Sequence, residues 1–260
     1  MILRAFIITL GLLLASPALT PALAAVEGEQ IGTVIETEGA VSLTGEDGVT
    51  HPASFEEPVR MNDVIVTGKG AKAFVQLVDG TEFTLSENAR LTVDQYVYNP
   101  DDETENKAVY SVLKGAFLYT SGLLAKNEDP DVQVNTPVGS IGIRGTQFWG
   151  GPIDASYGVL VNEGEVSVKS AIAKVILQKG QGTSLRGTHY RPSDAKLWAS
   201  DKVQRAMAAI TLKHPELVAE RIAARKELNA ELLQTRKARL LDRKREGIKN
   251  RMERKWQRPE

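Results

Sequence analysis

The sequence predicts a mainly β protein followed by a C-terminal α-helical region. From Ile31 to about Leu185, short segments of alternating apolar and polar residues are separated by glycine turns. Alternation with a period of two is typical of strands that bury one face. After Ser193 the composition changes to alanine, leucine, glutamate, lysine and arginine, which are all good helix formers.

The first 24 residues have the pattern of a signal peptide. Arg4 provides a short positive region, and residues 5–15 form an apolar run that is too short to span a bilayer. Ala22-Leu23-Ala24 then supplies the small residues of a cleavage site. We expect cleavage near Ala24 and export to a bacterial periplasm, with an uncleaved anchor as the alternative.

Six segments between glycine turns predict strands. They are Ala40–Thr44, Ala73–Val78, Glu82–Ser86, Ala116–Thr120, Glu165–Lys169 and Thr183–Leu185. The gaps between the turns are irregular, so the sequence predicts no fixed internal repeat. Many short strands with glycine turns are typical of a sandwich, a barrel or a short solenoid, and the pattern alone leaves these three open.

The segment Asn135–Phe148 carries the most specific pattern in the chain. Ile141 and Ile143 favour a strand, whereas Gly142 and Gly145 interrupt it. We expect at least one of these glycines to adopt a positive φ or to lie against a neighbouring strand. No lysine with serine or threonine follows the glycines, and the segment is therefore not a phosphate-binding loop.

This segment and five others, in the same order, resemble the FecR-like domain, a periplasmic all-β module known from iron-uptake signalling. The resemblance covers roughly residues 31–185. The matching segments are Val34–Val41, Val59–Gly68, Phe74–Thr81, Val112–Phe117, Thr136–Phe148 and Val159–Val168. Met61-Asn62 stands where the family usually has glycine. The resemblance implies an all-β module that binds or senses and does not catalyse.

The regulators that named this family carry a cytoplasmic anti-sigma helix bundle and a transmembrane helix. The sequence shows neither of these. A direct role on a sigma factor is therefore not expected.

Six motif residues are candidates for an interaction site: Thr136, Pro137, Gly142, Arg144, Gly145 and Thr146. Arg144 is the strongest polar candidate among them. Its guanidinium could bind a carboxylate or a phosphate. Alternatively, it could lie across the sheet and donate to carbonyl groups at the strand ends, which would hold the turn, and this second role is the one we favour.

No set of residues predicts catalysis, a metal or a cofactor. The chain has no cysteine, which excludes disulfides and thiol chemistry. His51, His189 and His214 are far apart in the sequence and lack the spacing of metal ligands. The acidic cluster at residues 101–105 lacks the spacing of a calcium loop, so we expect a solvated loop there. We therefore expect a protein that is not an enzyme and that has no cofactor.

Charge divides the chain near residue 193. Residues 1–192 hold about 14 basic and 23 acidic side chains, roughly −9, whereas residues 193–260 hold about 18 basic and 10 acidic side chains, roughly +8. The sequence therefore predicts three parts: a signal peptide at 1–24, an all-β domain at 25–192 and a basic helical region at 193–260.

Within the helical region, Ser193 is positioned to cap a helix that begins at Asp194. Pro215 is predicted to be the first residue of a second helix. The first helix carries a loose apolar stripe of Leu197, Val203, Met207 and Ile210. The second carries Val218, Ile222, Leu228, Leu232, Leu240, Ile248, Met252 and Trp256.

Two classes of function follow from these patterns. The first is an exported interaction or sensing module that acts in envelope signalling or scaffolding by binding an envelope protein or polymer. The second is an envelope-surface protein whose residues 193–260 bind anionic lipid or polysaccharide by charge. The basic helices could instead fold back on the acidic β domain and neutralise it. Nucleic acid is not expected as a partner of an exported protein.

Overall fold

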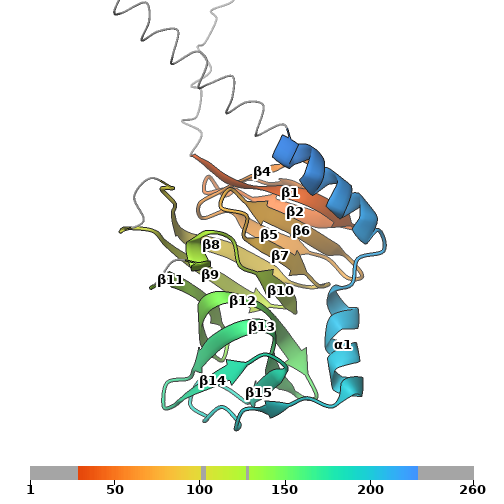
Figure 1. Cartoon of the computed structure of the whole chain (residues 1–260). Coiled ribbons are helices and arrows are strands. Elements are labelled where there is room, and N and C mark those ends of the chain that lie inside the picture. Colours follow the sequence, from red (N-terminus) through yellow and green to blue (C-terminus); the bar gives the residue numbers. More distant parts are fainter. Residues whose placement is uncertain (1–28, 101–103, 127–128, 228–260) are drawn as a thin grey trace, which may run out of the picture.

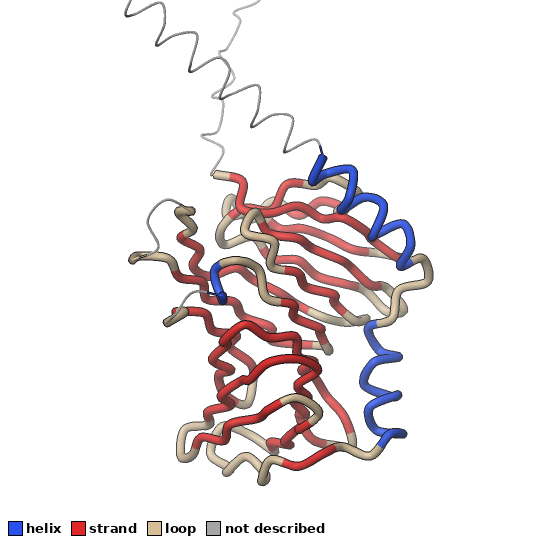
Figure 2. The backbone as a smooth tube through the Cα atoms, in the orientation of Figure 1, coloured by secondary structure: helices blue, strands red, loops and turns tan. Residues whose placement is uncertain are grey.

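The computed structural model describes residues 29–100, 104–126 and 129–227 (Figure 1). The predicted signal peptide, part of the acidic cluster and residues 228–260 lie outside the described residues. In the described part, a 16-stranded sheet is followed by helices (Figure 2). The prediction of a mainly β fold with a C-terminal helical region is thus confirmed.

The elements have the following bounds. The strands are β1 Gln30–Glu38, β2 Val41–Thr44, β3 Thr50–Pro52, β4 Pro58–Arg60, β5 Val64–Thr67, β6 Lys72–Leu77, β7 Glu82–Leu85, β8 Arg90–Val97, β9 Lys107–Lys114, β10 Phe117–Thr120, β11 Asp131–Thr136, β12 Gly139–Ile153, β13 Ser156–Lys169, β14 Lys174–Gln178, β15 Gln181–Leu185 and β16 Lys196–Leu197. A short 3-10 helix, η1, spans Leu124–Lys126, and α1 spans Ser200–Ile210. The second helix begins at Pro215 and is described as far as Glu227.

The sheet folds into two layers that share the long hairpin of β12 and β13. The first half of β12 pairs with β11, the second half pairs with β10, and β13 pairs along its length. Layer A runs β3-β2-β5-β8-β9-β11 and continues through the first half of β12 and the second half of β13 to β14. Layer B runs β4-β1-β6-β7-β10 and continues through the other halves of the hairpin to β15 and β16.

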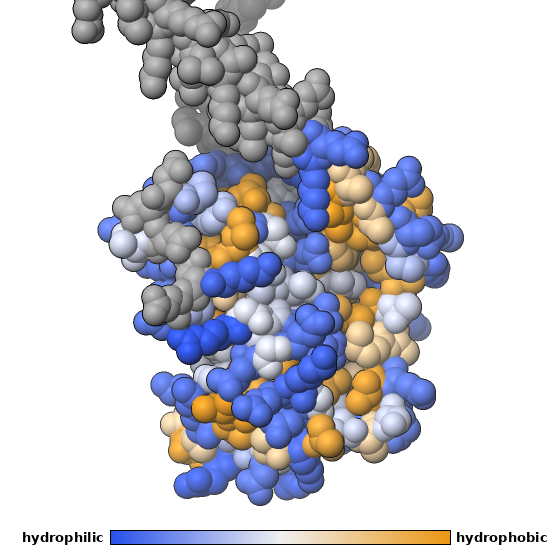
Figure 3. Space-filling model, viewed as in Figure 1, coloured by the Kyte–Doolittle hydropathy of each residue, from blue (hydrophilic) through white to orange (hydrophobic). Residues whose placement is uncertain are grey.

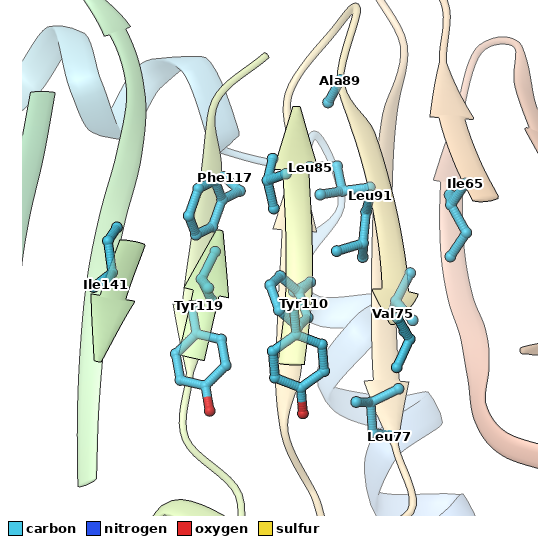
Figure 4. Packing of buried hydrophobic residues seen from close by; sticks show 14 of the residues in the cluster. Ile65, Val75, Leu77, Leu85, Ala89, Leu91, Tyr110, Phe117, Tyr119 and Ile141 are labelled. Atoms are coloured by element: carbon cyan, nitrogen blue, oxygen red, sulfur yellow. The ribbon is translucent and has the colours of Figure 1, made fainter. Parts of the chain in front are cut away.

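One hydrophobic core lies between the two layers. Phe83 of β7 in layer B packs edge-on against Tyr110 of β9 in layer A, with ring centroids 4.9 Å apart. Within layer B, Phe117 and Phe148 pack edge-on at 5.6 Å. Tyr110 and Tyr119 lie next to each other in this core (Figure 4). Aromatic contacts across the layers explain why the sheet folds over rather than staying flat, since each layer supplies the other's apolar cover.

Several tight turns carry the chain from one layer to the other. Gly39, Asn62, Asn88 and Gly115 lie in four such turns, and all have a positive φ. Asn62 has a φ of 67° and occupies a position where the resembling family usually has glycine. Asparagine tolerates the left-handed region better than most residues. Asparagine in place of the family's usual glycine therefore keeps the backbone geometry that this turn requires.

The helices cover the outer face of layer B. α1 packs through Ile210 against Trp149 of β12. The second helix packs through Val218 against Ile35 of β1 and Phe74 of β6. The described helices of the predicted helical region therefore pack on the β domain. The domain boundary between residues 192 and 193 stays a prediction.

The predicted start of the first helix is wrong. Ser193 does not cap a helix, because its hydroxyl accepts the N–H of Ser184 at 3.0 Å and its carbonyl accepts the hydroxyl of Thr183 at 2.6 Å. These bonds hold the chain against β15. α1 begins only at Ser200, after Ala199, which makes no side-chain cap.

Other expectations about this region are met. The second helix begins at Pro215 as predicted. Val203, Met207 and Ile210 of the predicted stripe all pack in the cluster beneath α1. Leu197 does not, since it belongs to β16 and is 74% exposed. No helix in the described ranges is long and apolar enough to cross a membrane.

Candidate functional site

The motif predicted from the sequence forms a hairpin turn and the long strand that follows it. Thr136 ends β11, and its hydroxyl donates to the carbonyl of Gly139 at 2.7 Å. Pro137 and Val138 occupy the turn between β11 and β12. Thr136 and Pro137 therefore set the entry of β12 into the sheet.

The middle of the motif is a corner at which both strands of the hairpin pass from layer A to layer B. Gly145 has a φ of 57°, and Gly164 on the paired strand has a φ of 75°. A Cβ at Gly164 would lie 2.3 Å from the carbonyl oxygen of Gly145. The expectation that Gly142 or Gly145 adopts a positive φ is confirmed at Gly145. Because glycine has no side chain, the backbones of β12 and β13 can approach closely at the corner. The pairing of the two strands then resumes beyond it.

Thr146 lies inside the molecule, with 3% of its surface exposed. Its backbone N–H donates to the hydroxyl of Ser121 at 2.8 Å, and its carbonyl accepts the N–H of Ser121 at 2.9 Å. Thr146 thus holds the corner against the end of β10 rather than presenting a surface group.

Arg144 lies on the surface at this corner. Its side chain is 65% exposed, and one guanidinium nitrogen lies 3.9 Å from a carboxylate oxygen of Asp129. In the sheet Arg144 is paired with Glu165 of β13. An ion pair this exposed contributes little to stability.

Gly142 lies on a broad outward side of layer A, between β8 and β14, which we call the open face. Two rows of paired residues cross it. They are Thr92, Ser111, Asn135, Ser140, Lys169 and Lys174 in the first row, and Gln95, Val109, Gln133, Gly142, Ser167 and Ile176 in the second. Two shorter rows follow, Val97, Lys107 and Asp131 in one and Arg144, Glu165 and Gln178 in the other. Residues between these positions, such as Tyr110 and Ile141, point into the core.

The centre of the open face carries small and polar side chains. Gln133 donates to the side-chain oxygen of Asn135 at 2.6 Å, and a Cβ at Gly142 would touch the hydroxyl of Ser167 at 3.3 Å. Serine, asparagine and glutamine side chains present both donors and acceptors. Six strands at about 4.8 Å spacing make a surface roughly 24 Å wide. This width suits a protein or an extended polymer better than a small molecule.

The open face differs from the outer face of layer B in polarity. The clusters that hold the described helices, with residues such as Trp149, Leu160 and Phe74, all lie on layer B. In the view of Figure 3, hydrophobic residues form separate patches within a mainly hydrophilic surface. Within the described part of the chain, the apolar outer face is thus the covered one and the polar outer face is the uncovered one.

A buried carboxylate, which the sequence did not single out as a site residue, organises one end of the core. Asp79 accepts hydrogen bonds from the backbone N–H and the hydroxyl of Thr81 at 3.0 and 2.8 Å, from the hydroxyl of Tyr96 at 3.0 Å and from the N–H of Leu124 at 3.2 Å. Burial and the nearby Asp79 raise the pKa of Tyr96 far above its usual value. The group is therefore a structural clamp and not an acid–base pair that works near neutral pH. The signal that could have found it is the Asp79-Gly80-Thr81 turn.

Hollows of about 360, 500 and 600 Å³ occur on the described surface, and the residues that line them form no catalytic constellation. One of about 360 Å³ lies between the layer ends, beside Pro137 and Tyr157, with Lys114 and Arg186 at its margin. His189 and His214 are exposed and His51 is half-buried. Among the described residues, no three potential metal ligands lie together.

Comparisons with known proteins identify the domain. Residues 63–167 match the family model described as FecR protein. The match begins just before β5 and ends within β13, so it is narrower than the span of residues 31–185 that the motifs predicted. No curated protein matches the chain.

Solved structures show only a distant likeness. Two crystal structures of a proposed anti-sigma factor from Parabacteroides distasonis ATCC 8503 align with TM-scores of 0.44 and 0.43 and with 20% and 18% identity, and each alignment covers 54% of this chain and 62% of the solved chain. A cell surface anchoring domain aligns with a TM-score of 0.24 and 21% identity over 24% of this chain and 83% of that chain. The chain thus spans less than two thirds of the two anti-sigma factor structures. By its family match, the chain contains a FecR-like domain, which includes the corner motif and most of the open face.

Proposed function

We propose that this chain is an exported, non-catalytic interaction module that senses or scaffolds in the bacterial envelope by binding a protein or polymer through the open face. The observation that carries the proposal is the contrast between the two outer faces. The apolar face of layer B is covered by the chain's own helices. The polar face of layer A carries the motif residues Gly142 and Arg144, and none of the described helices covers it.

The family match supports a binding role for this surface. Loop and surface polar residues that do not serve packing are frequent binding residues. The small side chains of Ser140, Gly142 and Ser167 let another backbone or a polymer approach the sheet closely. Arg144 at one end and Lys169 at the other supply cationic groups that could fix the orientation of a partner.

Export is part of the proposal and rests on residues 1–24. Their positive, apolar and small-residue regions follow one another in the order of a signal peptide. Mass spectrometry of the protein from its native host should give a mature chain that begins near Ala25. A chain that retains Met1 would contradict export by this route.

The binding proposal can be tested by affinity capture from an envelope extract of the native host. The Ser167→Arg variant places a large cation at the centre of the open face, whereas Ser54→Arg places the same group on an exposed loop elsewhere. We expect the native chain and Ser54→Arg to capture the same partner and Ser167→Arg to lose it. Equal capture by all three, with equal melting temperatures, would reject the open face as the site.

The second class of function, in which the basic helical region binds an anionic surface, has weaker support. Arg221 bonds the carbonyl of Ile35 at 2.8 Å and the carboxylate of Glu36, and Arg225 bonds the hydroxyl of Thr33 at 2.5 Å. These arginines fold back on β1 and are not offered to a membrane. Residues 228–260 carry about 11 basic and 5 acidic side chains, so any such binding would depend on them.

Vesicles of anionic lipid distinguish the two classes. Binding by the tail should be strong at 0.1 M salt and weak at 1 M, because the Debye length falls from about 10 Å to about 3 Å. A chain that ends at residue 227 should then not bind. If the full chain ignores the vesicles at both salt concentrations, the anionic-surface function is rejected and the open-face proposal is unaffected.

A further inference from the structure

The described sheet ends in four edge strands, and three of them are protected against pairing. β3 has three residues and contains Pro52, β4 has three residues and begins with Pro58, and β16 has two residues. Short strands and prolines prevent edge-to-edge association. β14 has five residues, Lys174–Gln178, and no proline. Of these four end strands, β14 is thus the one that is neither very short nor interrupted by proline.

Hydrogen bonds of the β13–β14 turn show which backbone groups of β14 point outward. The N–H of Ser170 donates to the carbonyl of Ala173 at 2.8 Å. Bonded and non-bonded pairs alternate in an antiparallel ladder. It follows that Val175 bonds to β13, whereas Lys174 and Ile176 direct their N–H and C=O groups away from it.

Gln178 at the end of the strand agrees with this alternation. Its N–H is not used by β13 and donates instead to the side-chain oxygen of Gln181 at 2.9 Å. The residues whose backbone groups point outward, Lys174, Ile176 and Gln178, also have their side chains on the open face. Ile176, which lies between the other two, is 51% exposed. The free edge therefore has an exposed isoleucine at its centre.

We propose that β14 pairs with β14 of a second copy of this chain, antiparallel, with the two-fold axis at Ile176. Each Ile176 then lies opposite its symmetry mate, where the two side chains cover each other. Lys174 lies opposite Gln178 of the second copy. The two open faces join into one continuous surface across the dimer.

Charge favours this register over its alternatives. Lys174 already lies opposite Lys169 in the sheet, and neither lysine has an ion pair among the described residues. Parallel pairing centred on Ile176 would place Lys174 of the second copy next to this row, followed by its Lys169, and like charges placed opposite each other are destabilising. In the antiparallel register the two lysines are followed by Gln178 and Glu165 of the second copy. Lys174 thus lies opposite a neutral glutamine instead of a lysine, and Glu165 of the second copy is one strand further along the row.

The chain is well suited to a direct test, because it has no cysteine. In the proposed register the Cα atoms of two opposed Ile176 residues are about 5.5 Å apart, which lies within the range of about 4.4–6.8 Å that a disulfide requires. The Ile176→Cys variant of the full chain should therefore form a covalent dimer on mild oxidation, visible on a non-reducing gel and reversed by reductant.

The matched control is Ile172→Cys. Ile172 is the same residue type, is 54% exposed and lies four positions away along the chain. In the proposed register two copies of residue 172 are about 26 Å apart, eight residues at about 3.3 Å each. Ile172→Cys should give little dimer. Equal dimer from both variants, or none from Ile176→Cys, would overturn the proposal.

A second measurement avoids cysteine chemistry. Sedimentation velocity of the unmodified full chain should show a concentration-dependent equilibrium between monomer and dimer, because a five-residue edge buries little area. Ile176→Lys opposes two lysines at the axis and should weaken the dimer by about tenfold or more, whereas Ile172→Lys should not. A chain that stays monomeric at all concentrations, or a dimer that Ile176→Lys leaves unchanged, would also overturn the proposal. Neither result bears on capture of a partner by the open face.

Discussion

The indole of Trp198 lies directly over Gly182, so that a Cβ at Gly182 would be 2.3 Å from its Nε1 atom. Gly158 on the neighbouring strand has the same relation to this ring, at 2.7 Å. The two glycines leave a flat surface on layer B for Trp198, which lies two residues before α1. Trp198 also packs edge-on against Trp149 at 6.0 Å. The β domain is thus shaped to receive its own C-terminal helix.

We expect Gly182→Val to displace Trp198 and loosen α1. Its side chain would overlap the indole, and overpacking of this kind costs about 1–3 kcal/mol. The free energy of unfolding should fall by that amount, and tryptophan fluorescence should shift to longer wavelength as the ring enters water. Gly187→Val is the matched control, since a Cβ there meets only Tyr190 at 3.5 Å. Equal effects from both variants would contradict the close packing of Trp198 on Gly182.

Two glycines at the corner should differ in their tolerance of alanine. Both have a positive φ, which costs an alanine roughly 1 kcal/mol. Gly145→Ala meets nothing closer than 3.6 Å, whereas Gly164→Ala would place its Cβ 2.3 Å from the carbonyl oxygen of Gly145. Thermal unfolding should therefore show a clearly larger loss for Gly164→Ala. A reversed order would show that the corner is built differently.

Asp79→Ala should be among the most destabilising single changes in the β domain. It removes the acceptor for Thr81, Tyr96 and Leu124. Each buried donor left without a partner costs about 1–3 kcal/mol, so we expect a total above about 3 kcal/mol in denaturant unfolding. Asp94→Ala, which removes one half-buried bond to Ser111, should cost only about 1 kcal/mol. Similar losses for the two variants would contradict the clamp.

The stability of the protein should depend on pH through Glu82. Burial raises the pKa of this carboxyl above its usual value of 4.5, against a smaller opposing effect of the hydrogen bond from Gln76. The folded state then holds the proton more tightly than the unfolded state, so the contribution to stability is present below pH 4.5 and is lost as the pH rises through the raised pKa. Glu82→Gln should therefore gain stability relative to the native chain between pH 4.5 and neutrality.

Melting temperatures measured across this pH range check the Glu82 prediction. Glu46→Gln serves as the control, because Glu46 is exposed. The stability of Glu82→Gln relative to this control should rise between pH 4.5 and neutrality. A difference between the two variants that is flat across this range would contradict the raised pKa of Glu82.

The strands were predictable because their signals are local. The turns at Gly39, Gly80 and Gly115 and the alternation in Phe83 and Leu85 each lie within a few residues of the strand that they define. The length of β12 and β13 was not predicted, since Gly145 and Gly164 looked like strand ends. In the structure they form a corner through which pairing continues.

The sequence contains a sign that the outer face of layer B is covered, although a search for alternating residues misses it. Val159, Leu160 and Val161 are apolar in succession, and all three are buried. A continuous apolar run is typical of a strand that is covered on both sides, so a second layer over this strand could have been expected. The start of α1 was not predicted, because the helix-forming composition after Ser193 does not show that this residue bonds back to Ser184 of β15.

The candidate site was predicted in part. Gly142 and Arg144 lie on the open face, whereas Thr146 is buried and Gly145 shapes the corner. The rows that join these residues to Gln133 and Ser167 depend on strand register. Register is set by pairing between distant segments, which a single sequence does not reveal.

The most direct test of the open face as a binding surface is photo-crosslinking in the native host, with a photoreactive amino acid at position 167 or, as control, at position 54. Residue 167 lies at the centre of the open face, and Ser54 lies on an exposed loop away from it. We predict a discrete covalent adduct from position 167 and none from position 54. Adducts of equal yield from both positions, or an adduct from position 54 alone, would contradict the open face as the partner's binding site.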